Sequence, residues 1–436
     1  MSKRIAIVGS GIAGLSVAHA LRGQAHVTLF EANDYFGGHA HTVDVTLPTP
    51  DGPLTHGVDT GFLVFNHRTY PRLRRLFEEL RVETAPAEMS FSVQAPTPHG
   101  RLEWSGHSLG TVFAQRSNLL RPRFWGMFAD LLRFNRLCTQ LAESGREAEL
   151  GQPLADFLDD HGFGAAFRDW YLLPMLACIW SCPEDQMLRF PVATMVRFCH
   201  NHGLLQVNDR PQWYTVAGGS RHYVQRIVAG VDDARLSSPV RSVQRSPDGV
   251  RVFTDRGAER FDELVLATHA PQALALLGAG ASAQERSVLG AIRTQPNRAV
   301  LHTDTRVLPT RRAAWAAWNF ETAGRGDRAV CLHYLINQLQ PLPWSQPVVV
   351  TLNPLRPIDP AHILGSYDYA HPVFDQVAVT AQRQLPRLQG EQRTWFCGAW
   401  TGYGFHEDGL SSGLAVAEGL LPRLHQPVPS ALAEAA

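Results

Sequence analysis

The beginning of the chain constrains the fold more than any other stretch. A short apolar run at residues 4–8 is followed by glycines at the spacing G-x-G-x-x-G (Gly9, Gly11 and Gly14) and then by a helix-like stretch. A second β-type run (HVTLFEAND) ends at Glu31. Strand, glycine turn, helix and strand in this order predict the opening half of a parallel α/β unit that binds a dinucleotide. A glycine-rich turn in an unrelated α/β domain is the alternative.

Each residue type in this pattern has a mechanical role. Gly9 permits the tight turn, Gly11 lets a pyrophosphate approach the backbone, and Gly14 lets the helix pack closely on the strand. The helix N-terminus then offers N–H groups and the positive end of its dipole to phosphates. Glu31 lies 20 residues beyond Gly11, where a carboxylate binds ribose hydroxyls and repels a 2′-phosphate. NADP is therefore disfavoured.

Further glycine-rich and β-type segments follow. The stretch GGHAHT (residues 37–42) suits a second backbone approach to the same pyrophosphate, and HGVDTGFLVF (residues 56–65) adds a glycine after an extended run. Residues 239–270 alternate like a β meander with turns at 247–249 and 256–257. The meander ends in a buried-strand run at residues 264–267.

The segment AWTGYGFHEDGLSSGLAVAEG, from Ala399 to Gly419, is too irregular for a strand and too glycine-rich at its start for a helix. It predicts a turn that brings backbone close to a ligand, followed by a helix from about Ser411 whose N-terminus points at that ligand. A plain turn that caps an ordinary helix through Ser411 or Ser412 is the alternative.

In this order, the three blocks resemble the flavin-dependent amine oxidase superfamily, which also holds the carotenoid desaturases and protoporphyrinogen oxidases. The resemblance implies an α/β fold in which a Rossmann-type FAD-binding domain is interleaved with a mixed α+β substrate domain, the amine oxidase/glutathione reductase-like architecture. The resemblance to the superfamily is weakest over residues 80–200 and 275–385. We expect an FAD-binding domain at residues 1–75, 205–275 and 385–425, a substrate domain at 76–204 and 276–384, and a flexible tail at 426–436.

The resemblance also implies roles for residues. Trp395 to Ala399 would form the last strand of the cofactor sheet, and the closing helix would aim at the N1–C2=O edge of the flavin, with Gly413 and Ala415 small so that it can approach. Residues expected at the reacting end are Tyr403, His406 and Glu407. Residues expected to contact FAD are Gly9, Gly11, Ile12, Ala13, Gly14, Glu31, Ala32, Gly38, His39, Thr60, Gly61, Val240, Ala267, Gly398, Asp408, Gly409, Leu410 and Gly413.

The chain departs from the superfamily pattern in ways that bear on the reaction. Amine oxidases of the superfamily commonly hold a lysine near the flavin N5, but Lys3 is the only lysine here and heads the first strand. Members with covalent flavin use a cysteine in a closing segment of different amino-acid sequence, whereas Cys397 precedes the turn. Both departures argue against amine oxidation. His39 stands where the superfamily usually has an arginine, which weakens phosphate neutralisation at that position.

The closing segment, together with HPVFD at residues 371–375, is similar to a group of bacterial predicted FAD-binding oxidoreductases. It is also similar to the oxidase-like N-terminal half of plant cyclopropane fatty acid synthases. This similarity implies an FAD-dependent oxidoreductase that abstracts a hydride from an apolar substrate, an unsaturated, methylated or cyclopropane fatty acyl chain, with O2 or another electron acceptor. The alternatives are a flavin-dependent amine oxidase and an FAD-bound accessory partner of a lipid methyltransferase.

Three segments of the expected substrate domain have a helical pattern. Residues 70–80 form an amphipathic helix with a charged outer face. Residues 116–138 interleave arginine with Trp, Phe and Leu, which fits a core helix with outward arginines, and alternatively a tunnel roof or a helix in a membrane interface. Residues 169–183 are apolar all round and predict a buried helix that is broken near Pro174.

Bulk composition excludes several classes. The formal net charge is zero, so no global field attracts nucleic acid. The six cysteines show no metal-ligand spacing, so we expect no metal site and reduced thiols in a cytoplasmic protein. No apolar run is long enough to span a bilayer, which leaves peripheral contact at the inner face of the membrane as the alternative.

Overall fold

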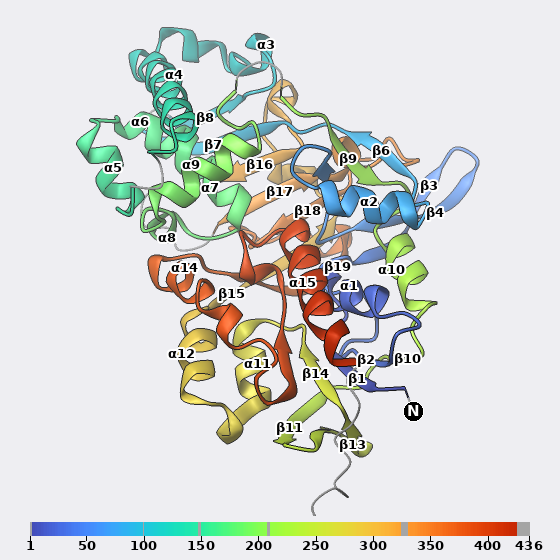
Figure 1. Ribbon diagram of the computed structural model, residues 1–436. Coiled ribbons are helices and arrows are strands. Elements are labelled where there is room, and N and C mark those ends of the chain that lie inside the picture. The colour runs from blue at the N-terminus through green and yellow to red at the C-terminus, as the bar shows by residue number, and fades with distance from the viewer. Residues whose placement is uncertain (1, 99, 147–149, 207–209, 324–329, 425–436) are drawn as a thin grey trace, which may run out of the picture. The chain divides into compact units, whose positions relative to one another are not determined.

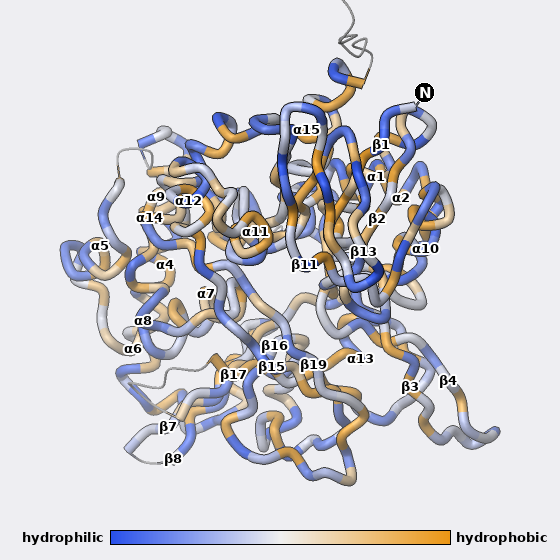
Figure 2. Tube along the Cα trace, turned by 90° about the horizontal axis from the view of Figure 1, so that it is seen from below, coloured by the Kyte–Doolittle hydropathy of each residue, from blue (hydrophilic) through white to orange (hydrophobic). Residues whose placement is uncertain are grey.

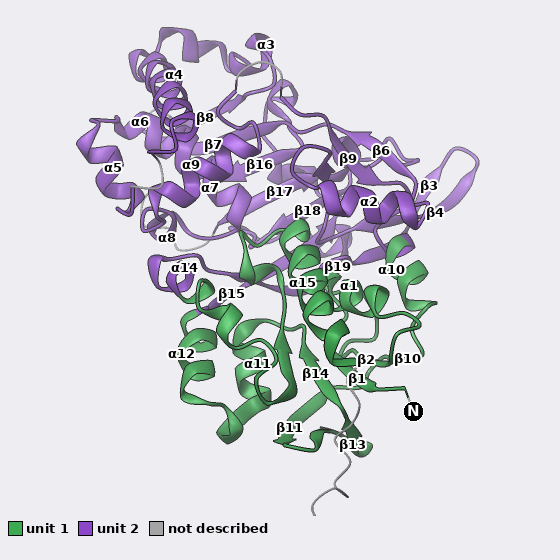
Figure 3. Cartoon of the chain, in the orientation of Figure 1, with its two compact units in different colours: residues 1–38, 223–291, 381–436 green, residues 39–222, 292–380 purple. Residues whose placement is uncertain are grey.

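The computed structural model describes residues 2–98, 100–146, 150–206, 210–323 and 330–424 (Figure 1). The tail predicted at residues 426–436 lies outside the described residues. The chain forms two compact units, which Figure 3 colours separately. Unit 1 comprises residues 1–38, 223–291 and 381–436, and unit 2 comprises residues 39–222 and 292–380.

The predicted FAD-binding segments and the compact units are defined by different criteria. A compact unit is defined by its packing, whereas the predicted domain is defined by the ligand that it would contact. Residues 39–75 and 205–222 pack within unit 2. That they also contribute to FAD binding stays a prediction.

Unit 1 is built on a parallel five-stranded sheet with the strand order β10-β2-β1-β14-β20. Strands β1 and β14 are buried almost throughout because helices cover the sheet, as in other parallel α/β folds. The strands are β1 (Arg4–Val8), β2 (His26–Phe30), β10 (Asp233–Arg235), β14 (Glu263–Leu266) and β20 (Thr394–Phe396). The helices are α1 (Ile12–Ala20), α10 (Arg221–Val228), α11 (Ala270–Leu277), α12 (Ala283–Ala291) and α15 (His406–Leu424).

The predicted meander is present in unit 1. Strands β11 (Val240–Ser246), β12 (Gly249–Thr254) and β13 (Gly257–Phe261) pair antiparallel in this order and lead into β14. The turns fall at the predicted positions because Gly249 and Gly257 both have positive φ angles.

Unit 2 contains a mixed seven-stranded sheet with the strand order β19-β15-β18-β17-β16-β7-β8. Only the β16–β7 pair is parallel among the pairs described in this sheet. Its strands are β7 (Phe91–Thr97), β8 (Gly100–Ser105), β15 (Thr294–His302), β16 (Trp318–Glu321), β17 (Cys331–Leu335), β18 (Val349–Leu352) and β19 (Ile363–Pro372). Smaller sheets pair β3 (Thr42–Thr49) with β4 (Gly52–Asp59), and β9 (Trp213–Val216) with β5 (Phe65–Asn66) and β6 (Thr84–Ala87).

The helices of unit 2 agree only partly with the predicted ones. Helix α2 (Pro71–Glu79) confirms the helix predicted at 70–80. The single helix predicted at 116–138 is wrong at its start: residues Arg116–Leu120 form a 3₁₀ turn, and α4 (Pro122–Glu143) begins at a proline. Proline is well suited to the first helical position but cannot donate to a preceding turn, so the regular helix starts there.

The helix predicted to break near Pro174 stays helical. Residues Arg168–Leu172 form a π-type turn that continues directly into α7 (Leu173–Trp180). Pro174 has no N–H to donate, and the irregular turn lies just ahead of it. The remaining helices of unit 2 are α3 (Leu109–Val112), α5 (Leu154–Asp160), α6 (Ala165–Phe167), α8 (Glu184–Met187), α9 (Val192–Asn201), α13 (Ile336–Leu339) and α14 (Gln376–Gln382), which ends at the boundary with unit 1.

Among the described residues, no helix is both long and apolar enough to cross a membrane.

Candidate functional site

Two glycines of the first turn are required by the packing of the protein itself. Gly9 has φ +101°, and a Cβ there would lie 2.6 Å from the carbonyl oxygen of Ala267. A Cβ on Gly14 would overlap the carbonyl oxygen of Gly9. Both positions therefore need glycine whether or not a ligand is present.

Gly11 differs from both. It has φ −62°, which any residue adopts, and a Cβ there would meet no atom of the described residues within 4 Å. Gly11 is the N-cap of α1, and no side chain caps this helix. Neither backbone strain nor packing explains the glycine, whereas a bound phosphate above the first N–H groups of α1, at Ile12 and Ala13, would explain it.

The second glycine pair lies against the first turn, as predicted. Gly37 and Gly38 have φ angles of +121° and +59°. A Cβ on Gly38 would lie 3.1 Å from the Cα atom of Gly11, and the Gly37 N–H donates to Ser10 Oγ at 3.1 Å. These residues, with the first turn of α1, form what we call the glycine cradle, defined by residues 9–14 and 37–38.

Glu31 is buried and supports the cradle. Its Oε2 accepts hydrogen bonds from the Ser10 N–H at 3.0 Å and the Ser10 hydroxyl at 2.5 Å, and its Oε1 accepts from the Asn33 N–H at 3.0 Å. The carboxylate therefore fixes the turn in addition to the ribose contact predicted for it. That second role stays a prediction. Ala32, the next residue, is exposed.

Ala267 and Val240 occupy neighbouring parts of unit 1. The Ala267 N–H donates to the Val8 carbonyl at 2.8 Å, which places Ala267 beside the cradle. The Ser238 N–H donates to the Glu31 carbonyl at 2.8 Å, and Val240 begins β11 two residues later. Segments that are more than 200 residues apart in the sequence thus meet where the cradle lies.

The closing helix starts earlier than predicted. Helix α15 begins at His406 rather than at about Ser411, so His406, Glu407 and Asp408 lie in its first turn. The Asp408 carboxylate accepts the Phe405 N–H at 2.9 Å, which satisfies a backbone donor at the helix start. This hydrogen bond stabilises the early start and uses a carboxylate that the sequence assigned to the cofactor.

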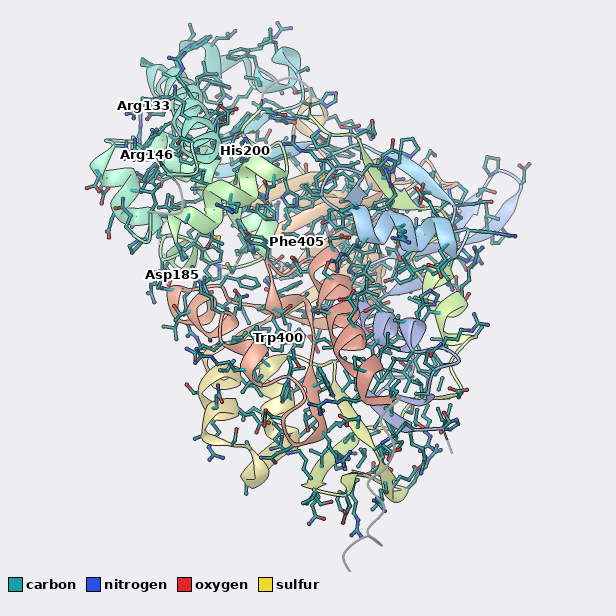
Figure 4. All side chains as sticks on the ribbon, in the orientation of Figure 1. Arg133, Arg146, Asp185, His200, Trp400 and Phe405 are labelled. Atoms are coloured by element: carbon teal, nitrogen blue, oxygen red, sulfur yellow. The ribbon has the colours of Figure 1, made fainter. Side chains whose placement is uncertain are left out.

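The turn ahead of α15 is held by its own contacts. The Trp400 indole is buried and donates to the Thr268 carbonyl at 2.9 Å, and a Cβ on Gly398 would overlap that indole. Figure 4 labels Trp400 and Phe405 in this segment. Trp400 is thus a core residue of unit 1, and Gly398 is needed for packing.

Helix α15 packs along α1, which corrects the reason given for its small residues. A Cβ on Gly413 would overlap Ser16 Oγ and the Ala13 carbonyl oxygen, and one on Gly409 would lie 2.8 Å from Ile12 Cγ2. Both glycines therefore allow α15 to pack closely against α1. Leu410 is buried beside the same helix, where its carbonyl oxygen accepts from Ser16 Oγ at 3.4 Å. Ala415 is exposed, so its small size is not required for packing against α1.

The register of these contacts makes the two helices parallel. The first turn of α15 lies beside the first turn of α1, and Gly413 lies one turn further along both. Their N-termini, and hence the positive ends of both helix dipoles, point to the same edge of unit 1 as the glycine cradle. An anion at this edge is stabilised by both helices.

His406 is held neutral at the start of α15. Its Nε2 lies 2.7 Å from the hydroxyl of Tyr223, which is fully buried on α10. Burial lowers the pKa of His406 to about 3, so the neutral imidazole is present at physiological pH. Burial raises the pKa of Asp408 to about 6. Burial thus moves the two groups in opposite directions, because it disfavours the charged form of each: the cation of histidine and the anion of aspartate.

The predicted reacting residues lie together on one short segment. Tyr403, His406 and Glu407 span the turn and the first turn of α15, and all three are half-buried. Their proximity to each other follows from this local structure. Their catalytic roles stay predictions.

The predicted cofactor residues of unit 2 cluster with each other. The Thr60 Oγ1 lies 2.6 Å from the Tyr369 hydroxyl, and the ring of His39 stacks on the ring of Tyr369 with centroids 5.1 Å apart. A Cβ on Gly61 would overlap the His39 carbonyl oxygen. His371 lies 5.2 Å from His39 by ring centroids.

Two members of this cluster, Tyr369 and His371 on β19, were not among the predicted site residues. The sequence HPVFD, which begins at His371, was the one feature that could have pointed to this part of the site. Also not among the predicted site residues was Asp59, a buried carboxylate that accepts from Ser220 N–H at 3.0 Å and from Gln340 Nε2 at 2.9 Å. Burial raises the pKa of Asp59 to about 6.

Unit 2 also holds three buried side chains that are able to bind a metal, although the sequence predicted no metal site. Ligand atoms of Glu321, Cys331 and His333 all lie within 4.8 Å of one another, because β16 and β17 pair Glu321 with Cys331. The carboxylate of Glu321 already forms ion pairs with Arg101 and, at 3.2 Å, with Arg356. These cations balance its charge, so the described contacts account for the cluster without a metal.

Comparisons with known proteins bear on the whole arrangement. Residues 7–80 match the family described as NAD(P)-binding Rossmann-like domain. A search of curated proteins gives no match.

Solved structures match over nearly the whole chain. A candidate protoporphyrinogen oxidase from Exiguobacterium sp. 255-15 is 19% identical with a TM-score of 0.68, covering 97% of this chain and 99% of that one. A CLA-producing fatty acid isomerase from P. acnes is 16% identical with a TM-score of 0.65, covering 96% and 98%. Cyclohexylamine oxidase from Brevibacterium oxydans IH-35A is 16% identical with a TM-score of 0.67, covering 98% and 100%.

At these identities the likeness establishes the fold. The chain has the flavin amine oxidase-like fold that these proteins share, which confirms the predicted fold class and, at the level of fold, the resemblance seen in the three glycine-rich blocks.

Proposed function

We propose that the protein is an FAD-dependent oxidoreductase that takes a hydride from a C–H bond of an apolar substrate. The observation that supports this most directly is Gly11. It is a glycine without a structural need, at the uncapped N-terminus of α1 and at the edge where two parallel helices direct their positive ends.

The residues of the glycine cradle fit FAD. A Cβ on Gly11 would fill space that no described residue uses, and Glu31 offers carboxylate lone pairs to a ribose beside its contacts to Ser10. Glu31 also opposes a 2′-phosphate. In this proposal the backbone N–H groups of α1 bind the pyrophosphate, and the start of α15 lies at the flavin.

Bound FAD supplies the hydride acceptor, and the protein supplies position, a dry environment and a route for the accompanying proton. Glu407 is the base in this proposal, because the imidazole of His406 is too weakly basic to hold a proton near neutral pH. His406 then orients the segment through its hydrogen bond to Tyr223. The electron acceptor that reoxidises the cofactor is O2 or another oxidant.

The substrate is, in this proposal, an unsaturated, methylated or cyclopropane fatty acyl chain. Support comes from the similarity of the closing segment to lipid-modifying proteins and from a fold shared with a fatty acid isomerase. The apolar character of the segment at residues 169–180 is compatible with this class of substrate.

Amine oxidation is the second candidate, because cyclohexylamine oxidase shares the fold. The position of Lys3 weighs against it. Lys3 precedes β1 at the end of the strand opposite to the cradle, and five strand residues at about 3.3 Å each separate the two ends. The only lysine is therefore remote from the reacting segment of unit 1.

The test is anaerobic reduction of the flavin, which is monitored as the loss of the flavin's visible absorbance. Extracted phospholipids with unsaturated or methylated acyl chains should bleach the flavin, and simple primary, secondary and polyamines should not. Glu407→Gln should keep the FAD and lose the bleaching. Bleaching by amines alone would favour the amine oxidase.

A matched variant separates chemistry from folding. Glu418→Gln changes an exposed acid on the same helix and should behave like the wild type in every assay. If no acyl lipid or amine reduces a fully loaded flavin, the enzyme proposal fails, and an FAD-bound partner of a lipid methyltransferase becomes the better reading.

A further inference from the structure

Helix α4 is apolar on two sides. Its inward side packs in unit 2, as expected for a surface helix, but its outward side carries Trp125, which is 50% exposed, and Leu132, which is 58% exposed. A surface helix normally directs polar residues outward. Figure 2 shows hydrophobic and hydrophilic residues along α4. The buried residues of α4 are Phe124, Met127, Leu131, Phe134, Asn135 and Cys138, and its exposed apolar residues are Pro122, Trp125, Gly126, Ala129 and Leu132, which are interspersed with the exposed Arg123, Arg133 and Arg136.

The exposed apolar surface extends beyond α4. Leu120 and Leu119, in the 3₁₀ turn before α4, are 87% and 48% exposed, and Leu109 at the start of α3 is 80% exposed. Of the ten large hydrophobic side chains that are exposed among the described residues, five lie between residues 109 and 132. Such a concentration marks an interaction surface rather than scattered exposure. We call it the α3–α4 face, defined by Leu109, Leu119, Leu120, Trp125 and Leu132.

The charges around the α3–α4 face are mostly positive. Between residue 105 and the end of α4 at Glu143 the sequence contains five arginines and two acids, Asp130 and Glu143. Asp130 is already used, because it accepts from Arg133 at 2.8 Å and from the Gly164 N–H at 2.8 Å. Figure 4 labels Arg133 on this helix. The five arginines are Arg116, Arg121, Arg123, Arg133 and Arg136.

Trp125 is prepared for an apolar environment. Its indole N–H donates to the Leu119 carbonyl at 3.0 Å, which satisfies both polar groups within the protein. An indole whose N–H is already bonded can leave water without losing a hydrogen bond. The same bond fixes Trp125 against the turn that presents Leu119 and Leu120.

We propose that the α3–α4 face binds the surface of a lipid bilayer that contains anionic lipids. Leucine and tryptophan side chains enter the boundary between headgroups and acyl chains, and the exposed Arg116, Arg123 and Arg136 bind lipid phosphates. A protein partner with this complementarity would need an acidic, apolar groove, whereas an anionic bilayer offers both properties over any area. The binding is peripheral, since no described helix is able to span a membrane.

The test is co-sedimentation of the full-length protein with vesicles, independent of its enzymatic activity and therefore of the proposed function. Wild-type protein should pellet with vesicles of phosphatidylcholine containing about a third phosphatidylglycerol. It should pellet less with phosphatidylcholine alone, and less at high salt. Leu120→Ser should reduce the partition coefficient several-fold, and Leu120→Ser with Trp125→Ala by roughly tenfold or more.

Matched controls use residues of the same type elsewhere. Leu54→Ser changes a leucine that is 44% exposed on β4, and Arg251→Ser changes an exposed arginine on β12; both should bind like the wild type. Arg116→Ser with Arg136→Ser should weaken binding to anionic vesicles by roughly tenfold. Wild-type protein that stays in the supernatant with both vesicle types overturns the proposal. So does a dimer in solution that Leu120→Ser dissociates, because the face would then be a contact between two copies.

Discussion

Gly11 and Gly413 belong to the same pair of helices but are glycine for opposite reasons. At Gly413, on the contact line between α15 and α1, a side chain would overlap Ser16 and Ala13. At Gly11, at the N-terminal edge of the pair, a side chain would meet no described residue. Gly413 is explained by the packing of the protein alone, whereas Gly11 would be explained by a bound ligand.

This difference separates stability from binding. A residue enclosed by the fold changes the free energy of unfolding when it is replaced, whereas a residue kept small for a ligand changes the ligand affinity. The two histidines His333 and His406 differ in their surroundings. His333 is enclosed in unit 2, where its Nε2 lies 3.0 Å from Glu321 and its Nδ1 lies 2.8 Å from Thr351, whereas His406 stands at the start of α15.

Gly11→Val should have the largest effect, and mainly on FAD affinity. The valine side chain occupies the place of the pyrophosphate, so the affinity should fall by at least about 4 kcal/mol, a factor of roughly 1,000. The melting temperature of the protein without FAD should change little, because valine at an N-cap loses only about 1 kcal/mol relative to glycine. Flavin titration and thermal denaturation of the same sample measure both. A fall in stability comparable to the fall in affinity would contradict the distinction.

Gly413→Val should give the converse result. Overlap with a backbone carbonyl forces α15 away from α1, which should destabilise the protein by about 3 kcal/mol even without FAD. Ala415→Val, on the exposed side of the same helix, should stay within about 0.5 kcal/mol of the wild type. Chemical denaturation checks both variants, and equal stability of the two would show that the helices do not pack as described.

Glu31 tests an intermediate case, because it both supports the turn and faces the expected ribose. Glu31→Ala should weaken FAD binding by roughly 1–3 kcal/mol. Ser10→Ala removes only the hydroxyl that donates to Glu31 and to which Gly37 donates. If Glu31 binds ribose, Glu31→Ala should lose clearly more affinity than Ser10→Ala. Identical losses would assign Glu31 to the turn alone.

The smallest effect, when it is expressed per pH unit, concerns the pH dependence of stability. Burial lowers the pKa of His406 from an ordinary 6.5 to about 3, so its contribution to stability is present above pH 6.5 and is lost as the pH falls toward 3. His333 behaves in the opposite way. Burial alone would lower its pKa, but Cys331 and Glu321 raise it to about 9, so its contribution is full below pH 6.5 and is lost as the pH rises through 9.

Replacing each histidine should therefore flatten one arm of the stability profile. His406→Gln should reduce the loss of stability on the acid side, and His333→Gln the loss on the alkaline side, each by at most about 1.4 kcal/mol per pH unit. Denaturation midpoints measured from pH 4 to 9 give both arms. An unchanged alkaline arm in His333→Gln would show that the ion pair with Glu321 is not formed.

Local features of the sequence predicted the fold well. Gly9, Gly249 and Gly257 need positive φ angles that glycine adopts readily, so the turns and the strands around them could be located without a structure. The start of α15 was missed, because glycine content outweighed the acids of its first turn, and Asp408 reaching back to Phe405 is the contact that extends the helix.

The candidate site was predictable only where one segment carries it. The cradle depends mostly on residues close together in the sequence, and it was expected except for Ser10 and its hydrogen bonds to Glu31 and Gly37. The reason for Gly413 requires knowledge that α1 is its neighbour, almost 400 residues away in the sequence. The cluster of His39 with Tyr369, and the alignment of Glu321 with Cys331, likewise depend on strand register, which no local pattern specifies.

Identification of the bound cofactor decides whether the glycine cradle holds FAD. The purified protein is denatured, the released cofactor is identified, and the protein without cofactor is titrated with FAD, FMN and NAD. We expect a yellow protein that releases one FAD per chain and rebinds FAD in preference to FMN and NAD, while folded Gly11→Val protein stays colourless. Folded wild-type protein that takes up no FAD, or Gly11→Val protein that binds FAD as the wild type does, would show that the cradle does not hold FAD.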